Sequence, residues 1–302
     1  MKIVGVDLTP VASKRETGQF SRHVIIRLST DEGLIGLGEM SDVMDWRIMY
    51  DLQDIKEAYE SLLLGKNPLE WKNLTVDGRE RFSMGGAIRA GFEIAIFDLV
   101  GKFRNQSVAD IFGGSLKDKL RVCYPIFRNF TIEMAEENVK RVHRRMKEGQ
   151  DLFRLYHGGN VDADELFLDS VRSRWGEKFV LKSLDFSRKF PWKQTIRALE
   201  RLSQYGPIHL ESVSDLREPE GMYEIRRRID LPISEHVHTP ELAFEYAKGR
   251  YVDIFNVCLS GTGGFTTAFQ IAEIARAAGI SCLVGTTQEL SIGVAAQAMF
   301  GS

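Results

Sequence analysis

Three carboxyl side chains end three short apolar runs: Asp185 ends FVLKSLD, Glu211 follows PIHL, and Glu235 follows LPIS. The runs are about one strand-plus-helix unit apart, so in a parallel barrel the acids would meet at the rim where barrel enzymes build active sites. Converging carboxylates repel one another unless a cation neutralises them, and oxygen-only ligands suit a hard divalent ion such as Mg²⁺. The spacing therefore predicts a magnesium site. The alternative is that all three are ordinary loop acids beyond strands.

The elements that would position these acids alternate regularly from about residue 120. The pattern predicts strands at 121–126, 151–157, 179–185, 207–212, 231–235, 252–258 and 280–285. It predicts helices near 131–148, 161–174, 191–204, 217–228, 239–248 and 264–278, with another from about 289. Such alternation indicates a parallel sheet with right-handed crossovers. Seven units, with no glycine fingerprint after the first strand, favour a barrel over an open doubly wound sheet.

The strand count is one short of a closed barrel. A barrel of this kind has eight strands, and an unclosed one leaves two exposed sheet edges. We therefore expect the eighth strand to come from a C-terminal tail that this sequence lacks, or from a neighbouring chain.

The first part of the chain has a different pattern. A strand at 2–10 and a hairpin at 22–39, with TDEG as its turn, precede helices at 51–64 and 87–105. Strands followed by helices predict a small α+β domain. We place this domain at 1–118 and the barrel at 119–302.

Composition excludes several classes of protein. The formal net charge of -2 predicts neither a nucleic-acid surface nor a membrane surface. The sequence has no run of 18 apolar residues, and its first residues lack the apolar core of a signal peptide. The odd, scattered set of Cys123, Cys258 and Cys282 fits reduced thiols. We expect a cytoplasmic protein.

Two longer segments carry a family resemblance. GFEIAIFDLVGKFRNQSVADIFGG (91–114) resembles the segment that ends the capping domain of the mandelate racemase and muconate-lactonizing branch of the enolase superfamily. DIFNVCLSGTGGFTTAFQIAEIARAAGI (253–280) resembles that branch's sixth strand, glycine pair and following helix. Asp185, Glu211 and Glu235 stand where the family places its magnesium ligands.

The resemblance implies an α+β capping domain and a (β/α)7β TIM barrel. It also implies that Mg²⁺ binds the carboxylate of a small substrate, that a base removes the proton α to that carboxylate, and that the metal stabilises the resulting enediolate. Family members are often homo-oligomers, and we expect the same here.

The usual bases of the family are absent. Where the second barrel strand usually ends in Lys-x-Lys, this chain has Arg154 and Tyr156. Cys258 replaces the sixth-strand Lys of lactonizing relatives. Asp253 is present, but Gly285 stands where racemase-like relatives carry a His.

Substitute bases can be named. Residues two apart share a strand face, so Arg154 could lower the pKa of Tyr156, by about one or two units, and let the phenol act as a base. The Cys258 thiolate could serve beside a metal or an arginine. Alternatively, Arg154 pairs with a carboxylate, Tyr156 is a hydrogen-bonding wall and Cys258 fills space. Glu289 resembles an acid that lactonizing relatives place after their seventh strand, where it could donate a proton.

Other residues could contact substrate. Arg15, Arg22 and Trp46 lie in segments that match the closing loops of relatives, and His236 could reach the site from the loop after Glu235. The position of His157 predicts a surface or loop residue. That of Lys182 predicts a side chain that points into the surrounding helices or the barrel interior rather than to the ligand.

These observations predict a magnesium-dependent enzyme that acts on a small carboxylate, with an acid-sugar dehydratase as the leading reaction. The alternatives are a racemase, epimerase or cycloisomerase of the same superfamily, and a metal-binding protein that has lost its bases.

Overall fold

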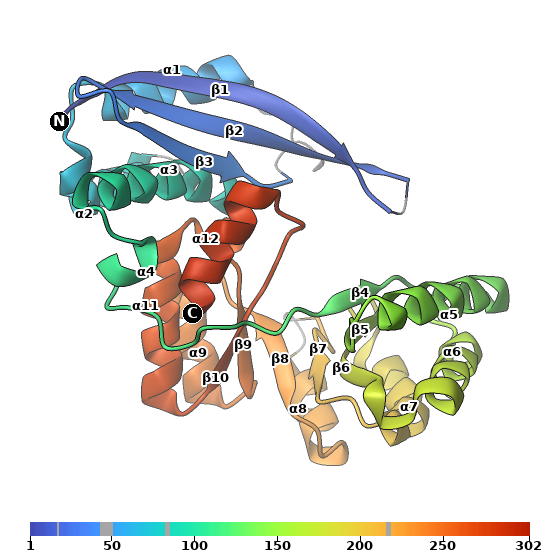
Figure 1. The fold of residues 1–302 in the computed structure, drawn as a ribbon. Coiled ribbons are helices and arrows are strands. Elements are labelled where there is room, and N and C mark those ends of the chain that lie inside the picture. Colours follow the sequence, from blue (N-terminus) through green and yellow to red (C-terminus); the bar gives the residue numbers. More distant parts are fainter. Residues whose placement is uncertain (17, 43–50, 82–84, 216–218) are drawn as a thin grey trace. The chain divides into compact units, whose positions relative to one another are not determined.

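The computed structural model describes residues 1–302 except 17, 43–50, 82–84 and 216–218 (Figure 1). Packing divides these residues into two compact units. Unit 1 comprises Met1–Leu120, His236–Glu245 and Asn256–Ser302, and unit 2 comprises Arg121–Glu235 and Tyr246–Phe255. The chain first passes from unit 1 to unit 2 close to the predicted domain boundary at 118. It later returns to unit 1, so the two units are not two continuous segments of the sequence.

Unit 1 contains an antiparallel sheet of β1 (Ile3–Lys14), β2 (Phe20–Thr30) and β3 (Ile35–Met40), in that order. Helix α3 (Gly86–Arg104) packs along this sheet (Figure 1). The contact depends on glycine: a Cβ at Gly38 would lie 2.0 Å from the carbonyl oxygen of Gly91 on α3. The predicted hairpin and the predicted buried helix are confirmed.

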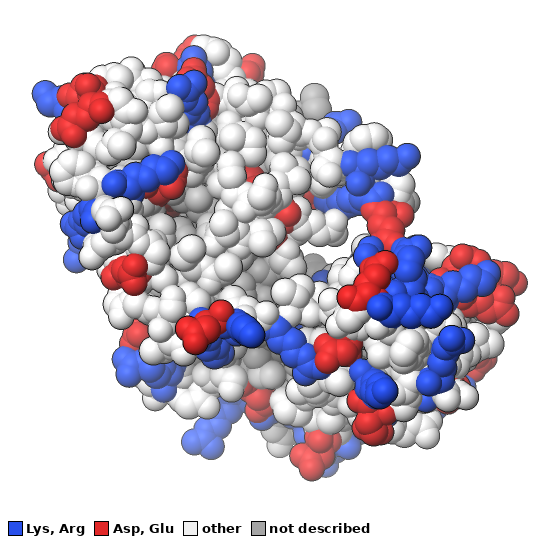
Figure 2. All heavy atoms as spheres, in the orientation of Figure 1, with Lys and Arg blue, Asp and Glu red and all other residues white. Residues whose placement is uncertain are grey.

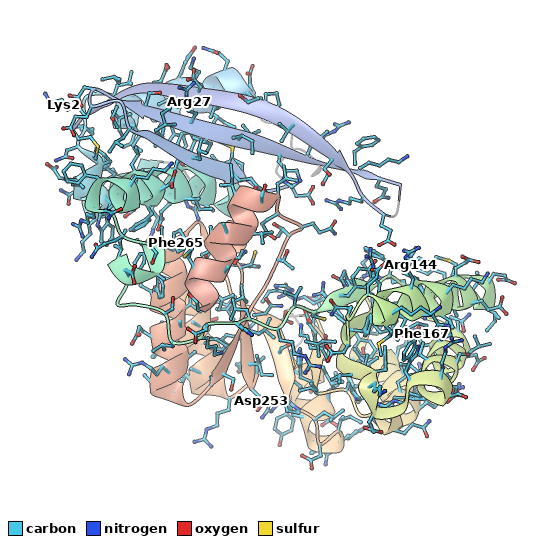
Figure 3. The ribbon with its side chains drawn as sticks, viewed as in Figure 1. Lys2, Arg27, Arg144, Phe167, Asp253 and Phe265 are labelled. Carbon is cyan, nitrogen blue, oxygen red and sulfur yellow. The ribbon has the colours of Figure 1, made fainter. Side chains whose placement is uncertain are left out.

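The other helices that begin in unit 1 are mostly short. They are α1 (Leu52–Leu63), α2 (Trp71–Arg81), α4 (Val108–Ile111), α9 (Pro240–Gly249), α10 (Leu259–Thr262), α11 (Phe265–Ala278) and α12 (Ser291–Gly301). The sequence pattern missed α2, whose residues are mostly polar and include Gly78. Phe265, at the start of α11, lies 5.5 Å from Phe97 of α3, measured between ring centroids (Figure 3).

All seven predicted barrel strands are present. They are β4 (Tyr124–Ile126), β5 (Leu152–Tyr156), β6 (Val180–Asp185), β7 (His209–Glu211), β8 (Ile233–His236), β9 (Ile254–Val257) and β10 (Ser281–Val284). Their order is β10-β9-β8-β7-β6-β5-β4, and the pairings from β4 to β8 are parallel. The predicted α/β class is confirmed. In the described residues, β4 and β10 end the strand order, as expected for seven strands.

Helices alternate with the strands of unit 2: α5 (Ile132–Lys147), α6 (Val161–Trp175), α7 (Trp192–Leu202) and α8 (Pro219–Arg228). Their apolar faces are buried. Phe167 of α6 is fully buried, and its ring lies 6.4 Å from that of Phe179, just before β6 (Figure 3). This packing fixes β6 and therefore the position of its last residue, Asp185.

Charge is mixed over the face in Figure 2, where basic and acidic side chains alternate without a large patch of one sign. Within the described ranges, no helix combines the length and the apolar character needed to cross a membrane.

Candidate active site

The three predicted metal ligands lie at matching strand ends in unit 2. Asp185 ends β6 and pairs in register with Glu211, which ends β7. Glu211 in turn pairs with Ser234 of β8, so Glu235 lies one residue further along its strand. The three residues are 0–3% exposed. The sheet register thus brings three buried acids to consecutive strand ends.

Cations of the same unit hold these acids. Arg154 Nη1 on β5 lies 3.0 Å from Glu211 Oε1 and 3.7 Å from Asp185 Oδ2. Lys182 Nζ lies 3.6 Å from Glu211 Oε2. Beyond β6, Arg188 Nη2 donates to Glu235 Oε1 at 2.7 Å. The formal charges of three carboxylates and three cations cancel.

The surroundings of Asp185 raise the pKa of its carboxyl group. Burial and the nearby Glu211 carboxylate raise its pKa from 3.8 to about 6. Arg154 and two hydrogen bonds oppose that shift, from the Ser187 backbone N–H at 2.7 Å and its hydroxyl at 3.0 Å. An additional positive charge beside Asp185 would stabilise its ionised form.

These acids fit magnesium by donor type. Buried carboxylate oxygens are suitable ligands for a hard divalent ion, and burial together with repulsion from Glu211 raises the pKa of Asp185, an effect that such an ion would oppose. In the part of the chain that the structure describes, no three His, Cys, Asp or Glu side chains are gathered in a group that could hold a metal ion. Binding of one ion by Asp185, Glu211 and Glu235 together therefore stays a prediction.

Arg154 and Tyr156 lie together, as predicted from their spacing on one strand. Arg154 Nη2 donates a hydrogen bond to the Tyr156 hydroxyl, and the guanidinium carbon lies 4.4 Å from the ring centroid. However, the predicted decrease in the pKa of Tyr156 is wrong. Burial raises this pKa to about 12 and outweighs the effect of Arg154. In this state the phenol is protonated at neutral pH, so it is a better proton donor than a proton acceptor.

Cys258 and Glu289 belong to a polar cluster in unit 1. Cys258 Sγ lies 3.0 Å from Ser260 Oγ and 3.7 Å from Glu289 Oε1, and Gln297 Nε2 donates to the sulfur at 3.3 Å. Glu289 also accepts from the backbone N–H of Thr287 at 2.9 Å. Burial, followed by the Glu289 charge, raises the pKa of the Cys258 thiol. These surroundings disfavour a thiolate.

The predicted substrate-binding residues are dispersed within unit 1. Arg15 pairs with Asp42, near the buried His23–Glu39 pair. Arg22 lies on β2 opposite Ala12. The ring of His236, at the end of β8, lies 5.9 Å from that of His238. Trp46 falls outside the described residues.

Two predictions about neighbouring residues need correction. His157 lies in the loop directly after β5, as expected, but it is buried rather than on the surface: its Nδ1 lies 2.6 Å from Asp164 Oδ2, and its ring packs 5.1 Å from that of Phe186. Lys182 is not directed away from the acids, since it approaches Glu211. Sequence reasoning also missed Arg188. The sequence feature that could have indicated its role is its position: a basic residue three positions after Asp185 can reach the ends of the next strands.

Comparisons with known proteins show the family of this chain. The family described as "Mandelate racemase / muconate lactonizing enzyme, N-terminal domain" matches residues 1–113, and "Enolase C-terminal domain-like" matches residues 135–302. The chain belongs to the mandelate racemase and muconate-lactonizing branch of the enolase superfamily. The predicted family is thus confirmed.

Curated relatives of this superfamily member are isomerases by name. An N-succinyl-L-Arg/Lys racemase from Bacillus cereus is 26% identical over 90% of this chain and 74% of its own. An L-Ala-D/L-Glu epimerase from Bacillus subtilis is 25% identical over 99% of this chain and 82% of its own. A muconate cycloisomerase 1 from Pseudomonas putida is 26% identical over 93% of this chain and 76% of its own.

Solved structures show the same fold. A muconate lactonizing enzyme from Pseudomonas putida has a TM-score of 0.88 at 22% identity, covering 99% of this chain and 84% of its own. A dipeptide epimerase from Enterococcus faecalis, complexed with Mg and the dipeptide L-Leu-L-Tyr, has a TM-score of 0.84 at 23% identity, covering 99% of this chain and 87% of its own.

Proposed function

We propose that this protein is a magnesium-dependent isomerase that removes the proton α to the carboxylate of a small substrate. The observation that carries the proposal is the group of buried acids at consecutive strand ends, next to the Arg154–Tyr156 pair. The curated relatives support isomerisation, since their names describe racemases, epimerases and cycloisomerases. They give no specific support to the acid-sugar dehydratase expected from the sequence.

The roles of this chain's residues follow from their chemistry. Asp185, Glu211 and Glu235 hold the ion. A divalent ion there supplies positive charge to the substrate carboxylate and to the negative charge that develops on proton removal. Arg154 offsets the negative charge of Asp185 and Glu211 and orients the Tyr156 hydroxyl. The phenolate form of Tyr156, which is the minor form at neutral pH, accepts the α-proton, and the phenol so formed then donates a proton to the substrate carbon.

Among isomerisations we favour epimerisation of N-acylated amino acids or dipeptides. The racemase and the epimerase named above act on compounds of that kind by name, and each such compound has a carboxylate beside a carbon that carries one proton.

The test separates isomerisation from dehydration by mass. The purified chain is incubated with Mg²⁺ and with panels of N-succinyl amino acids, dipeptides and acid sugars, and the products are resolved by chiral chromatography with mass detection. The proposal predicts a product of unchanged mass with inverted configuration at one carbon. A product lighter by one water would instead establish a dehydratase, and no turnover on any panel member would favour a protein without catalytic bases.

A further inference from the structure

Arg188 reaches Glu235 from an unusual turn. Ser187 and Arg188 follow Asp185 with positive φ angles of 52° and 56°, a backbone region that residues other than glycine seldom adopt. The backbone N–H of Arg188 donates to the Ser212 carbonyl at 2.8 Å, which ties the turn to the segment after β7. Backbone strain of this kind persists where the surrounding structure enforces it, commonly at functional sites. The turn directs the guanidinium to the end of β8.

The two partners differ in exposure and in the number of their contacts. The Glu235 side chain is fully buried and also accepts from Ser212 Oγ at 2.9 Å, whereas the Arg188 side chain is 31% exposed. Arg188 Nε is buried and makes no hydrogen bond within the described residues. Arg154, by contrast, contacts Glu211, Asp185 and Tyr156 and is 14% exposed. Arg188 is therefore the cation of this cluster that can move towards solvent while its carboxylate stays in place.

We infer that Arg188 is a resident counter-ion of Glu235 that a divalent ion must displace, and that it thereby sets the affinity of the site for metal. The inference rests on the proposed assignment of Glu235 as a metal ligand. Magnesium binds oxygen at about 2.0–2.1 Å, so an ion on either oxygen of the Glu235 carboxylate would lie close to the guanidinium that holds Oε1 at 2.7 Å, and the two cations would repel each other. Loading of the site consequently includes the separation of this ion pair.

The direct test is calorimetric titration of the full chain with MgCl2 and with MnCl2, after removal of metal by EDTA and dialysis. Arg188→Gln should lower Kd by about tenfold or more, because the ion then meets a carboxylate with no competing cation. Arg188→Lys keeps a competing charge and should stay near the parent. Arg226→Gln is the matched control: it breaks an Arg–carboxylate pair of unit 2 with Asp253, at 2.6 Å, that includes none of the three acids (Figure 3).

The outcomes separate this inference from the proposed function. If Arg188→Gln binds Mg²⁺ no more tightly than the parent, or if Arg226→Gln gains as much affinity, the inference is wrong while the metal site stands. If no protein binds either ion, both the inference and the metal assignment fail.

A second measurement needs no variant. A crystal structure of the parent with Mn²⁺ should show the ion on Glu235 and Arg188 turned away from it. An ion on Glu235 with Arg188 still hydrogen-bonded to that carboxylate would overturn the inference.

Discussion

Replacing Arg154 with methionine should destabilise the protein by about 3–5 kcal/mol at pH 8, because it removes the cation that lies beside both Asp185 and Glu211, two buried carboxylates. Arg154 is 14% exposed and lies 3.0 Å from the fully buried Glu211 and 3.7 Å from Asp185. Methionine keeps much of the volume of the arginine side chain, so the loss of stability reflects the removed charge more than lost packing. The Arg226–Asp253 pair, whose side chains are 32% and 38% exposed, provides the control, and Arg226→Met should cost about 0–1 kcal/mol.

The loss of stability in Arg154→Met should also depend on pH, and the pKa of Asp185 determines whether the loss grows or shrinks as the pH rises. Its pKa is higher in the folded chain, about 6, than its ordinary value of 3.8. The folded state therefore binds more protons between these values, and ionisation of Asp185 lowers stability progressively as the pH rises from about 4 to 6. Removal of Arg154 raises that pKa further, so the additional loss is present at pH 8 and shrinks towards pH 4.

Urea titrations of the parent, Arg154→Met and Arg226→Met in EDTA, at pH 4.5 and pH 8, measure both effects. Equal losses for the two variants at pH 8 would refute the claim that Arg154 compensates buried charge. A loss from Arg154→Met that is as large at pH 4.5 as at pH 8 would refute the electrostatic cause.

Three further predictions concern single side chains. Burial raises the pKa of Glu93 from 4.5 to about 7, so the parent should lose up to about 3 kcal/mol of stability as the pH rises from 5 to 8.5. In urea titrations, Glu93→Gln should reduce this dependence of stability on pH. An unchanged dependence would contradict the raised pKa of Glu93. If Tyr156 removes the proton, its pKa of about 12 predicts that the rate of α-proton exchange rises about tenfold per pH unit from pH 7 to 9. Tyr156→Phe should abolish this exchange. A rate that stops rising near neutral pH would indicate another base. Cys258, buried with a raised thiol pKa, should resist alkylation in the native protein at pH 8, as followed by mass spectrometry; rapid modification would restore it as a candidate thiolate base.

The strands and their terminal acids could be predicted from the sequence because both depend on local patterns. Each apolar run ends in one acid, and parallel pairing brings such ends together, as the register of Asp185 with Glu211 shows. The Arg154–Tyr156 contact was predictable for the same reason, since residues two apart share a strand face. Helix α2 was missed because its polar residues carry little helical periodicity.

Electrostatics and turn geometry could not be predicted in the same way. The pKa of Tyr156 depends on how deeply the phenol is buried, and desolvation exceeded the effect of an arginine that was correctly placed. Arg188 reaches Glu235 only because Ser187 and Arg188 both adopt left-handed backbone angles, and a Ser-Arg sequence does not predict such angles. The burial of His157 depends on Asp164, whose position is set by packing of α6.

The measurement that tests the central claim most directly is α-proton exchange in D2O, followed by proton NMR on N-succinyl amino acids and dipeptides, with Mg²⁺ and then with excess EDTA. The proposed function predicts that the α-proton signal of at least one compound disappears only with active protein and Mg²⁺, and that Asp185→Asn is inert under the same conditions. Exchange that persists in EDTA, or in Asp185→Asn, would contradict a reaction that depends on metal held by these acids.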